Sequence, residues 1–239
     1  MAVVFDISGP IGMFRRPYTT TSSVSFPVPP PTSVAGLISA ILGFDNGSND
    51  EASKALYWEN IKGTKVAVAI TRPLAWSTGT INFWNMKEPQ KNIHIRVKHQ
   101  FVKNPGYRIY VSGGVEGKLQ ELLENGRFIY TPYLGTAYAL ADIQYCGSFP
   151  EVLVQSGKMA LSTVIPQLEG TRIDFDIKNT GGVFRERLPY ALSAERAFQE
   201  SINVFYSSDP SQNITLSGWE GLDVSTVGDE NVAWFPAWQ

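Results

Sequence analysis

Alternating hydrophobic and polar residues mark several short stretches in the first half of the chain. Residues 3–7 (VVFDI) alternate and end at a Ser-Gly-Pro breaker. The stretches 64–74, 106–113 and 136–149 are rich in the β-branched and aromatic residues that strands favour. The pattern therefore predicts four strands, the last of them over 136–149.

Two other stretches carry apolar residues at helical spacing. In residues 32–43 they follow the pattern i, i+3, i+4, i+7 and i+8, which predicts a helix. These positions are Val34, Leu37, Ile38, Ile41 and Leu42. Thr32 or Ser33 is expected to cap the helix, and Gly43 to end it. A second helix is predicted over 115–126, closed by Gly126.

The predicted order of elements is β-α-β, a long ribbon, and again β-α-β. This is the order of the ferredoxin-like split βαβ fold, which is also the core of RNA-recognition domains, and it predicts an α+β class. We expect this core over 1–150, with a β-hairpin at about 75–103 inserted between the second and third core strands. Residues 151–239 predict irregular β-structure packed on the core.

The inserted ribbon has two unlike faces. In residues 92–100 (NIHIRVKHQ), strand periodicity places the apolar side chains on one face and the cationic ones on the other. The apolar set is Ile93, Ile95 and Val97, and the polar set is His94, Arg96 and Lys98. Residues 87–108 hold six basic residues against one acid, Glu88. The six are Lys87, Lys91, Arg96, Lys98, Lys103 and Arg108.

Charge is unevenly divided along the rest of the chain. Residues 197–239 hold six acids and no Lys or Arg, so the formal net charge of −2 leaves +4 on residues 1–196. A basic body beside an acidic region favours a polyanion bound by one part of the surface. Ordinary variation in charge placement is the alternative.

Few residues suit metal binding or nucleophilic catalysis. His94 and His99 are the two histidines, and five residues apart on a strand they face opposite sides. Cys146 is the single cysteine, lies in a predicted strand and is expected to be a buried hydrophobe. Its solitary state excludes an internal disulfide and suits a reducing cytoplasm. No phosphate-binding P-loop is present, and we expect no cofactor and no metal.

Cations beside aromatic rings are typical of a surface for single-stranded nucleic acid, since Lys and Arg neutralise phosphates and rings stack on bases. The ribbon supplies Phe83 and Trp84 on its first arm, and the loop FRRPYTT supplies cations and hydroxyls. The candidate RNA-binding residues are Arg15, Arg16, Tyr18, Thr19, Lys91, His94, Arg96, Lys98, Lys103 and Arg108. A solvated loop for the first arginines and an edge charged against aggregation for the ribbon are the alternatives. Tyr133, Thr136 and Tyr138 are expected in the core, with contact to a ligand as the alternative.

Four motifs resemble blocks of a known family. The long block 6–43 (DISGPIGMFRRPYTTTSSVSFPVPPPTSVAGLISAILG) is similar to the N-terminal signature of the Cas family five proteins, RAMP-type subunits of type I CRISPR Cascade complexes. NPGYRIYVSG (104–113) and YTPYLGTAYALADI (130–143) resemble later blocks of the branch near subtype I-B. RERLPYALSAERAF (185–198) is a weaker match.

This resemblance implies a non-catalytic subunit that caps the 5′ handle of CRISPR RNA. The ribbon occupies the position of the family's projecting thumb hairpin, which packs beside the first backbone subunit. The implied handle contacts are Arg15, Arg16 and Tyr18, and the implied thumb contacts are His94, Arg96 and Lys98. The implied partners are the crRNA, the Cascade backbone and large subunits, and target DNA indirectly, with no membrane. The helix N-terminus at 32–35 is a further candidate phosphate site.

Two departures from the family pattern leave other functions open. The C-terminal glycine-rich loop of RAMP proteins is at best degenerate here, as NTGGV (179–183). In one branch the equivalent protein cuts precursor RNA without metal, through Tyr, Lys and His side chains. A similar site would need Tyr18, Lys98 and either His94 or His99. A protein-binding module whose ribbon meets an acidic partner is the third hypothesis.

Overall fold

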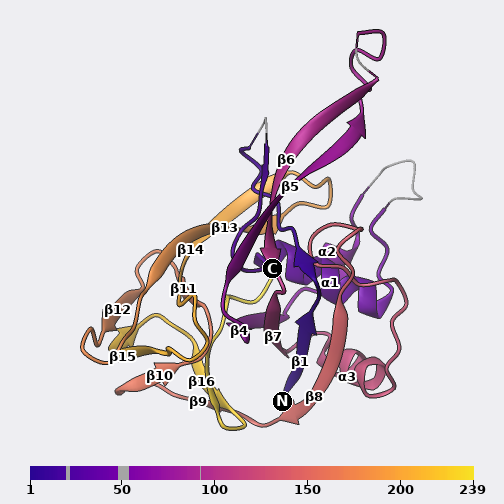
Figure 1. Ribbon diagram of the computed structural model, residues 1–239. Coiled ribbons are helices and arrows are strands. Elements are labelled where there is room, and N and C mark those ends of the chain that lie inside the picture. Colours follow the sequence, from indigo (N-terminus) through magenta and orange to yellow (C-terminus); the bar gives the residue numbers. More distant parts are fainter. Residues whose placement is uncertain (20–21, 48–53, 92) are drawn as a thin grey trace.

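The computed structural model describes residues 1–19, 22–47, 54–91 and 93–239, and strands dominate it (Figure 1). Its helices are α1 (Pro31–Leu42), α2 (Tyr57–Asn60) and α3 (Glu116–Glu124). The strands of the first half are β1 (Ala2–Ser8), β2 (Ile11–Gly12), β3 (Ser22–Val24), β4 (Lys65–Ile70), β5 (Ala75–Trp84), β6 (His94–Lys103), β7 (Gly106–Ser112) and β8 (Asp142–Phe149). Those of the second half are β9 (Glu151–Leu153), β10 (Met159–Leu161), β11 (Ile165–Gln167), β12 (Arg172–Phe175), β13 (Phe184–Leu192), β14 (Phe198–Tyr206), β15 (Ile214–Glu220), β16 (Val224–Val227) and β17 (Glu230–Ala233). The expected α+β class is confirmed at this level.

A four-stranded sheet of order β4-β7-β1-β8 forms the centre of the molecule, and all its neighbouring strands are antiparallel. Successive residues of β1 enter different cores, as the period of two requires. Val3, Phe5 and Ile7 pack with α1 and α3, whereas Ala2 and Val4 pack with residues of β16, β17 and Trp234. The sheet is therefore buried on both faces.

Helix α1 matches its predicted extent but not its predicted cap. It starts at Pro31 with Pro30 as N-cap, and no side chain caps it. Proline is favoured in the first turn because the N–H groups there have no acceptor within the helix, so the N–H that proline lacks is not missed. Gly43 ends the helix in the left-handed conformation, at φ 75°, as expected. The prediction that Thr32 or Ser33 caps α1 is therefore wrong.

The fourth core strand is shorter than predicted, since β8 begins only at Asp142. Gly135 has φ +86°, and the Ala139 N–H donates to the Thr136 carbonyl, so a turn occupies 136–139. Tyr133 and Tyr138 are 45% and 48% exposed, so the expectation that they lie in the core is wrong. Cys146 is exposed too, contrary to the expectation of a buried thiol.

Strands β5 and β6 form the expected hairpin, which projects from the body (Figure 1). Its register runs from Trp84 opposite His94, near the tip, to Ala75 opposite Lys103 at the base. Near the base β6 also pairs with β2 (antiparallel) and β3 (parallel). Strands from outside the hairpin therefore pair with it only along its lower half.

The second half of the chain contributes three small sheets, of orders β10-β15-β12, β11-β14-β13 and β17-β16-β9. Strand β13 packs against α1. Leu188, Tyr190, Ile202 and Val204 belong to the same hydrophobic cluster as Phe5. The segments 1–150 and 151–239 therefore share one core.

Edge strand β4 is covered by backbone from the second half. The Val164 N–H donates to the Val68 carbonyl at 2.7 Å, and the Phe235 N–H donates to the Val66 carbonyl at 2.9 Å. The Trp238 N–H donates to the Thr64 carbonyl at 3.0 Å. These bonds satisfy groups that an open edge would offer to another chain.

The hydropathy of the helices bears on membrane association. Over the residues described above, none of the helices has the length and apolar character of a membrane span.

Replacement of Trp238 by Ala should lower the free energy of unfolding by about 3–5 kcal/mol, as expected for a fully packed aromatic side chain. Trp238 is 3% exposed and meets Trp58 edge to face, with ring centroids 6.1 Å apart. The matched control is Trp84→Ala, since Trp84 is 68% exposed on the hairpin. It should change stability by less than about 0.5 kcal/mol. Urea unfolding measures both, and equal losses would contradict this account of the core.

Candidate nucleic-acid interface

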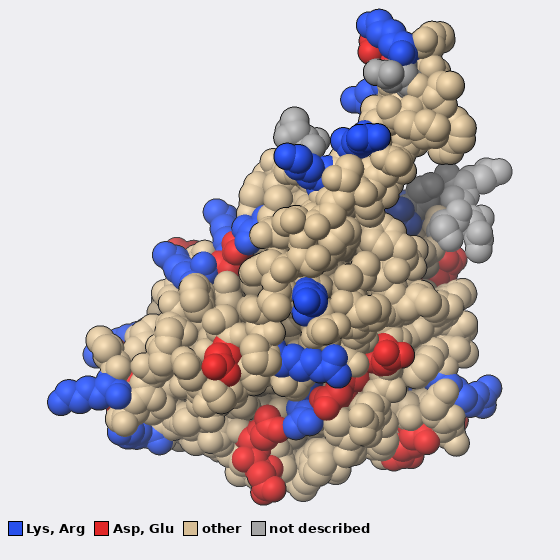
Figure 2. All heavy atoms as spheres, viewed as in Figure 1, with Lys and Arg blue, Asp and Glu red and all other residues tan. Residues whose placement is uncertain are grey.

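The register of the β5–β6 hairpin sorts its side chains onto two faces. On the first face, which we call the cationic face, lie Thr78, Thr80, Asn82, Trp84, His94, Arg96, Lys98 and Gln100. On the second, the apolar face, lie Ile81, Phe83, Ile95, Val97, His99 and Phe101. The sets predicted over 94–98 are therefore separated as expected, whereas Ile93 lies beyond the paired strand and lines a hollow together with Trp84, His94 and Arg96. Figure 2 shows Lys and Arg side chains along the projecting arm, and acidic side chains mainly over the lower body.

The outer part of the cationic face combines an aromatic ring with positive charge. The Trp84 and His94 rings lie 4.7 Å apart between centroids, with planes tilted by 37°. Together with Lys91 and Arg96 they line a shallow hollow of about 710 Å³. Trp84 is 68% exposed, so a flat base could stack on its free surface while the cations neutralise phosphate.

A second hollow lies lower on the same face, where β3 joins the hairpin. It measures about 450 Å³, and Ser22, Thr78, Thr80, Lys98 and Gln100 contribute to its lining. Hydroxyl and amide groups can bond phosphate or sugar oxygens and hydroxyls. The two hollows lie along one strand, β6, and make the cationic face a continuous candidate path for a single strand.

The apolar face is buried near the base of the hairpin and exposed toward its tip. The His99 ring lies 5.5 Å from that of Phe101, nearly parallel at 12°, and its Nδ1 lies 2.9 Å from the Val97 carbonyl oxygen. His99 is only 5% exposed, so it serves packing and is a poor candidate for a catalytic base. Toward the tip Ile95 is 42% exposed on this face, and Ile93, just before β6, is 57% exposed.

Arg16, a predicted handle contact, is tied into the fold. Its guanidinium donates to both carboxylate oxygens of Glu186 on β13, at 2.5 and 3.1 Å, and to the Tyr18 hydroxyl at 2.6 Å. It also lies over the Phe26 ring, 5.0 Å from the centroid. Burial alone would lower the pKa of Arg16, but the hydrogen bonds to Tyr18 and Glu186 raise it above its ordinary value. Much of its charge is therefore balanced within the protein.

The other predicted residues of this loop are more open. Arg15 is exposed and donates to the Thr19 carbonyl at 3.2 Å. Tyr18 is 65% exposed, and the Thr19 hydroxyl donates to the Arg16 carbonyl at 2.9 Å. A ligand could approach Arg15 and the Tyr18 ring without breaking the Arg16–Glu186 pair.

Arg108 lies on the central sheet, away from the cationic face. Its guanidinium forms ion pairs with Asp6 at 2.7 Å and Glu230 at 2.5 Å. The hydrogen bonds that Arg108 donates to Asp6, opposed by partial burial, raise its pKa above the ordinary value. A cation held by two carboxylates offers little net charge to phosphate. The pairs give Arg108 a structural role, in joining β1, β7 and β17.

The remaining predicted cations lie on the hairpin. Lys91 is exposed near the tip, 2.9 Å from Glu88, and Lys103 is exposed at the base opposite Ala75. The structure therefore brings together Lys91, His94, Arg96 and Lys98 along one arm. Sequence reasoning missed Ser22, Thr78 and Gln100 as lining residues. The alternation in WSTGT (76–80) could have placed Thr78 and Thr80 on one face of the strand. The position of Ser22 depends on the parallel pairing of β3 with β6, which no local sequence pattern indicates.

Comparison with protein families gives a match over most of the chain. The model of one family, described as "CRISPR-associated protein (Cas_Cas5)", matches residues 2–188. No curated protein matches the sequence.

Three solved structures resemble the fold over most of its length. A CRISPR protein from Archaeoglobus fulgidus is 13% identical, with a TM-score of 0.58 and 99% of both chains covered. A chain of a CRISPR RNA-guided surveillance complex is 11% identical, with a TM-score of 0.52 and 91% of both chains covered. A chain of a Type III-B Cmr-beta complex bound to cognate target RNA and AMPPnP is 11% identical, with a TM-score of 0.50. That match covers 89% of the present chain and 86% of the other.

Neighbouring arginines should respond differently to replacement by Ala. Arg16→Ala should lower the free energy of unfolding by about 1–3 kcal/mol, because Glu186 loses charge-assisted hydrogen bonds in a half-buried place. Arg15→Ala, the matched control, should change it by less than about 0.5 kcal/mol. A double-mutant cycle with Glu186→Gln, followed by urea unfolding, should show coupling for Arg16 only. Additive effects of Arg16→Ala and Glu186→Gln would count against the structural role.

Proposed function

The chain belongs to the CRISPR-associated Cas5 family, and we propose that it is an RNA-binding subunit of a CRISPR surveillance complex. The observation that carries this proposal is the cationic face, where an exposed Trp84 ring lies against His94 beside Arg96 and Lys98. Single-stranded RNA is bound through such a combination of stacking rings and phosphate-neutralising cations. One similar fold occurs in a CRISPR RNA-guided surveillance complex, which agrees with this role.

In finer detail, we propose that the subunit caps the 5′ handle of the crRNA in a type I complex, of subtype I-B or near it. The β4-β7-β1-β8 sheet with α1 and α3 is interpreted as the ferredoxin-like core, and the β5–β6 hairpin as its thumb. The RNA follows the cationic face from the Trp84–His94 end toward Lys98. Arg15 and Tyr18 add contacts from the N-terminal loop.

The apolar face supports a further part of the proposal, contact with neighbouring subunits. Ile93 and Ile95 are exposed near the end of an arm that projects from the body, where covering them would be favourable (Figure 1). We propose the backbone subunit as the partner at this tip, and contact with the large subunit elsewhere. Target DNA is then met indirectly, through the complex, in the cytoplasm.

We propose that the subunit is not itself a nuclease. Metal-independent cleavage would need a base that reaches a ribose hydroxyl. The buried, stacked His99 is a poor base, and His94 is engaged with the Trp84 ring. These placements favour binding over cleavage.

Binding of a labelled CRISPR repeat RNA should weaken with salt in proportion to the phosphates neutralised. Replacing both Arg96 and Lys98 by Ala should reduce the slope of log affinity against log salt by about 1.4, since each contact with a single strand contributes about 0.7. The control replaces Lys158 and Lys178, which are exposed in the β10–β12 region, far from the hairpin (Figure 1). An unchanged slope in the Arg96 and Lys98 variant would remove these residues from the interface.

The same RNA incubated with the protein in EDTA should give a shifted band on a native gel and an intact band on a denaturing gel. A lane without protein controls for spontaneous hydrolysis. A single new product at a fixed position would make the chain a processing enzyme instead, with His94 the first residue to replace. Absence of crRNA from the protein purified with its partners would refute the RNA-binding role itself.

A further inference from the structure

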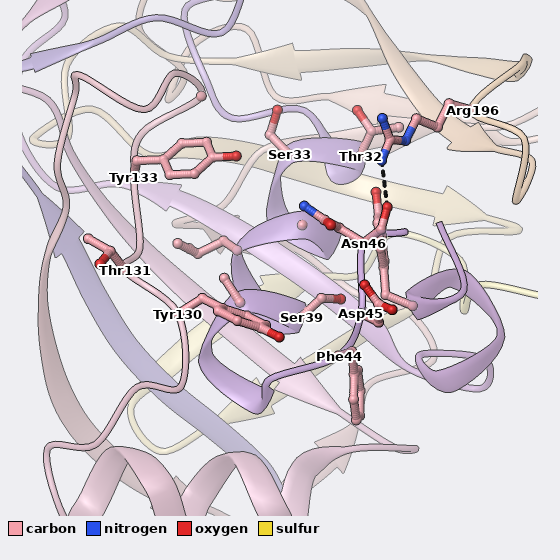
Figure 3. A pocket seen from close by; sticks show the side chains of 15 residues that line it. Thr32, Ser33, Ser39, Phe44, Asp45, Asn46, Tyr130, Thr131, Tyr133 and Arg196 are labelled. Carbon is pink, nitrogen blue, oxygen red and sulfur yellow. Dashed lines mark hydrogen bonds between the residues drawn. The ribbon is translucent and has the colours of Figure 1, made fainter. Parts of the chain in front are cut away.

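A cavity of about 510 Å³ lies on α1 (Figure 3), and its lining residues come from outside the hairpin. Four parts of the chain line it. They are α1 with the segment that follows it, Tyr57 at the start of α2, the loop at 130–135, and the turn between β13 and β14 that carries Arg196. Its volume is that of a typical small-ligand site.

The floor of the cavity is formed by small residues of α1. Ser33, Gly36 and Ala40 follow one another at helical spacing along the lining. A Cβ built on Gly36 would meet no atom within 4 Å. The space over Gly36 is thus open, and a larger side chain there would extend into the cavity without displacing protein atoms near its Cβ.

One wall of the cavity is aromatic and firmly placed. The Tyr130 N–H donates to the Ala40 carbonyl at 2.9 Å, and the Ile129 N–H donates to the Ile41 carbonyl at 3.2 Å. These carbonyls belong to the last turn of α1, which has no helical partners for them. Tyr130 and Tyr133 remain 52% and 45% exposed. Figure 3 shows Tyr133 extending toward Ser33 and the Tyr130 ring lying nearer Ser39. Both rings are available for stacking.

The opposite wall is polar and carries both signs of charge. Arg196 uses one N–H to reach the Asn46 carbonyl, at 2.5 Å, and a guanidinium has five such donors. Its head lies beside Thr32 in the first turn of α1 (Figure 3), where the helix dipole also favours an anion. Asp45 is oriented by the Gly47 N–H, at 2.8 Å, and offers its other oxygen as an acceptor.

A buried hydroxyl in the same cavity points to a ligand independently of the helix end. Ser39 is 2% exposed and lines the cavity, yet its Oγ has no hydrogen-bond partner among the residues that the structure describes. A buried hydroxyl without a partner is costly. A ligand with polar edges would supply that partner.

We propose that this cavity binds one nucleotide of single-stranded RNA, turned out of the strand. The phosphate lies between Arg196 and the start of α1, and the base stacks against Tyr130 or Tyr133. Asp45 accepts a hydrogen bond from the ribose or from an exocyclic amine of the base. An inorganic anion would leave both rings and the Asp45 carboxylate unused. This inference rests on the proposed function, since it assigns a second contact to the same RNA.

Filling the cavity provides the test. Gly36→Leu should weaken binding of the labelled repeat RNA by about tenfold, the effect of losing a stacked base. Gly117→Leu is the matched control, because Gly117 is also helical, in α3, and a Cβ there also meets nothing within 4 Å. Both variants should melt no lower than the parent protein, since Leu favours a helix more than Gly does.

A second variant separates this cavity from the cationic face. Tyr130→Ala should weaken binding severalfold without changing the salt slope, because no charge is removed, and Tyr130→Phe should retain the parent affinity. RNA carrying 4-thiouridine should form a photo-crosslink in the peptide that contains Tyr130 and Tyr133, and Gly36→Leu should abolish it.

The outcomes distinguish this inference from the proposed function. If the parent protein binds RNA and only the Arg96 and Lys98 variant is weakened, the cavity inference is overturned and the proposed function stands. If Gly36→Leu blocks binding of adenosine 5′-monophosphate alone and leaves RNA affinity unchanged, the cavity takes a free nucleotide and its assignment to RNA is wrong. If the parent binds no RNA, with or without partners, the proposed function fails and this inference fails with it.

Discussion

Burial of the central sheet on both faces is the constraint on which the rest of the structure depends. A sheet of β4, β7, β1 and β8 covered by helices alone would leave its second face and the β4 edge to water. Residues after 150 close both, through Trp234 on the second face and backbone bonds from Val164, Phe235 and Trp238 on the edge. Because the sheet is held this way, the β5–β6 hairpin can project from one end without adding to the core.

The cations of the chain fall into two groups, those that form ion pairs within the fold and those that are exposed on the hairpin. Arg16, Lys65 and Arg108 each meet carboxylates from distant segments, so their charge joins parts of the fold. Burial opposes ionisation of Glu151, but hydrogen bonds from Lys65, Ser112 and Ser225 prevail and lower its pKa. Arg96 and Lys98 of the hairpin instead stand exposed on the cationic face, the face that also carries Trp84, where an external polyanion can meet them. Net charge hides this division, because paired and unpaired cations count equally in it.

Two candidate contacts with RNA would use different physics. On the hairpin, exposed cations give an attraction that is long-ranged and weakened by salt. In the cavity beside α1, shape, stacking on tyrosines and a buried hydroxyl would add salt-independent contributions to the charge contact at Arg196. The first would gather the strand and the second would fix its position. Both are formed on elements held by the same central core, which would keep their spacing constant.

The sequence by itself determined the local elements, because periodicity and turn residues act over short distances. It predicted α1, the four core strands, the order of elements and the two unlike faces over residues 94–98, and it carried the family resemblance. Tertiary structure alone decided which cations were free, since the carboxylates that pair with Arg16 and Arg108 lie at Glu186 and Glu230, far along the chain. It also decided the length of β8, the shared core of 1–150 and 151–239, and the cavity on α1. These depend on long-range contacts between side chains and backbone groups, which no local pattern of residues records.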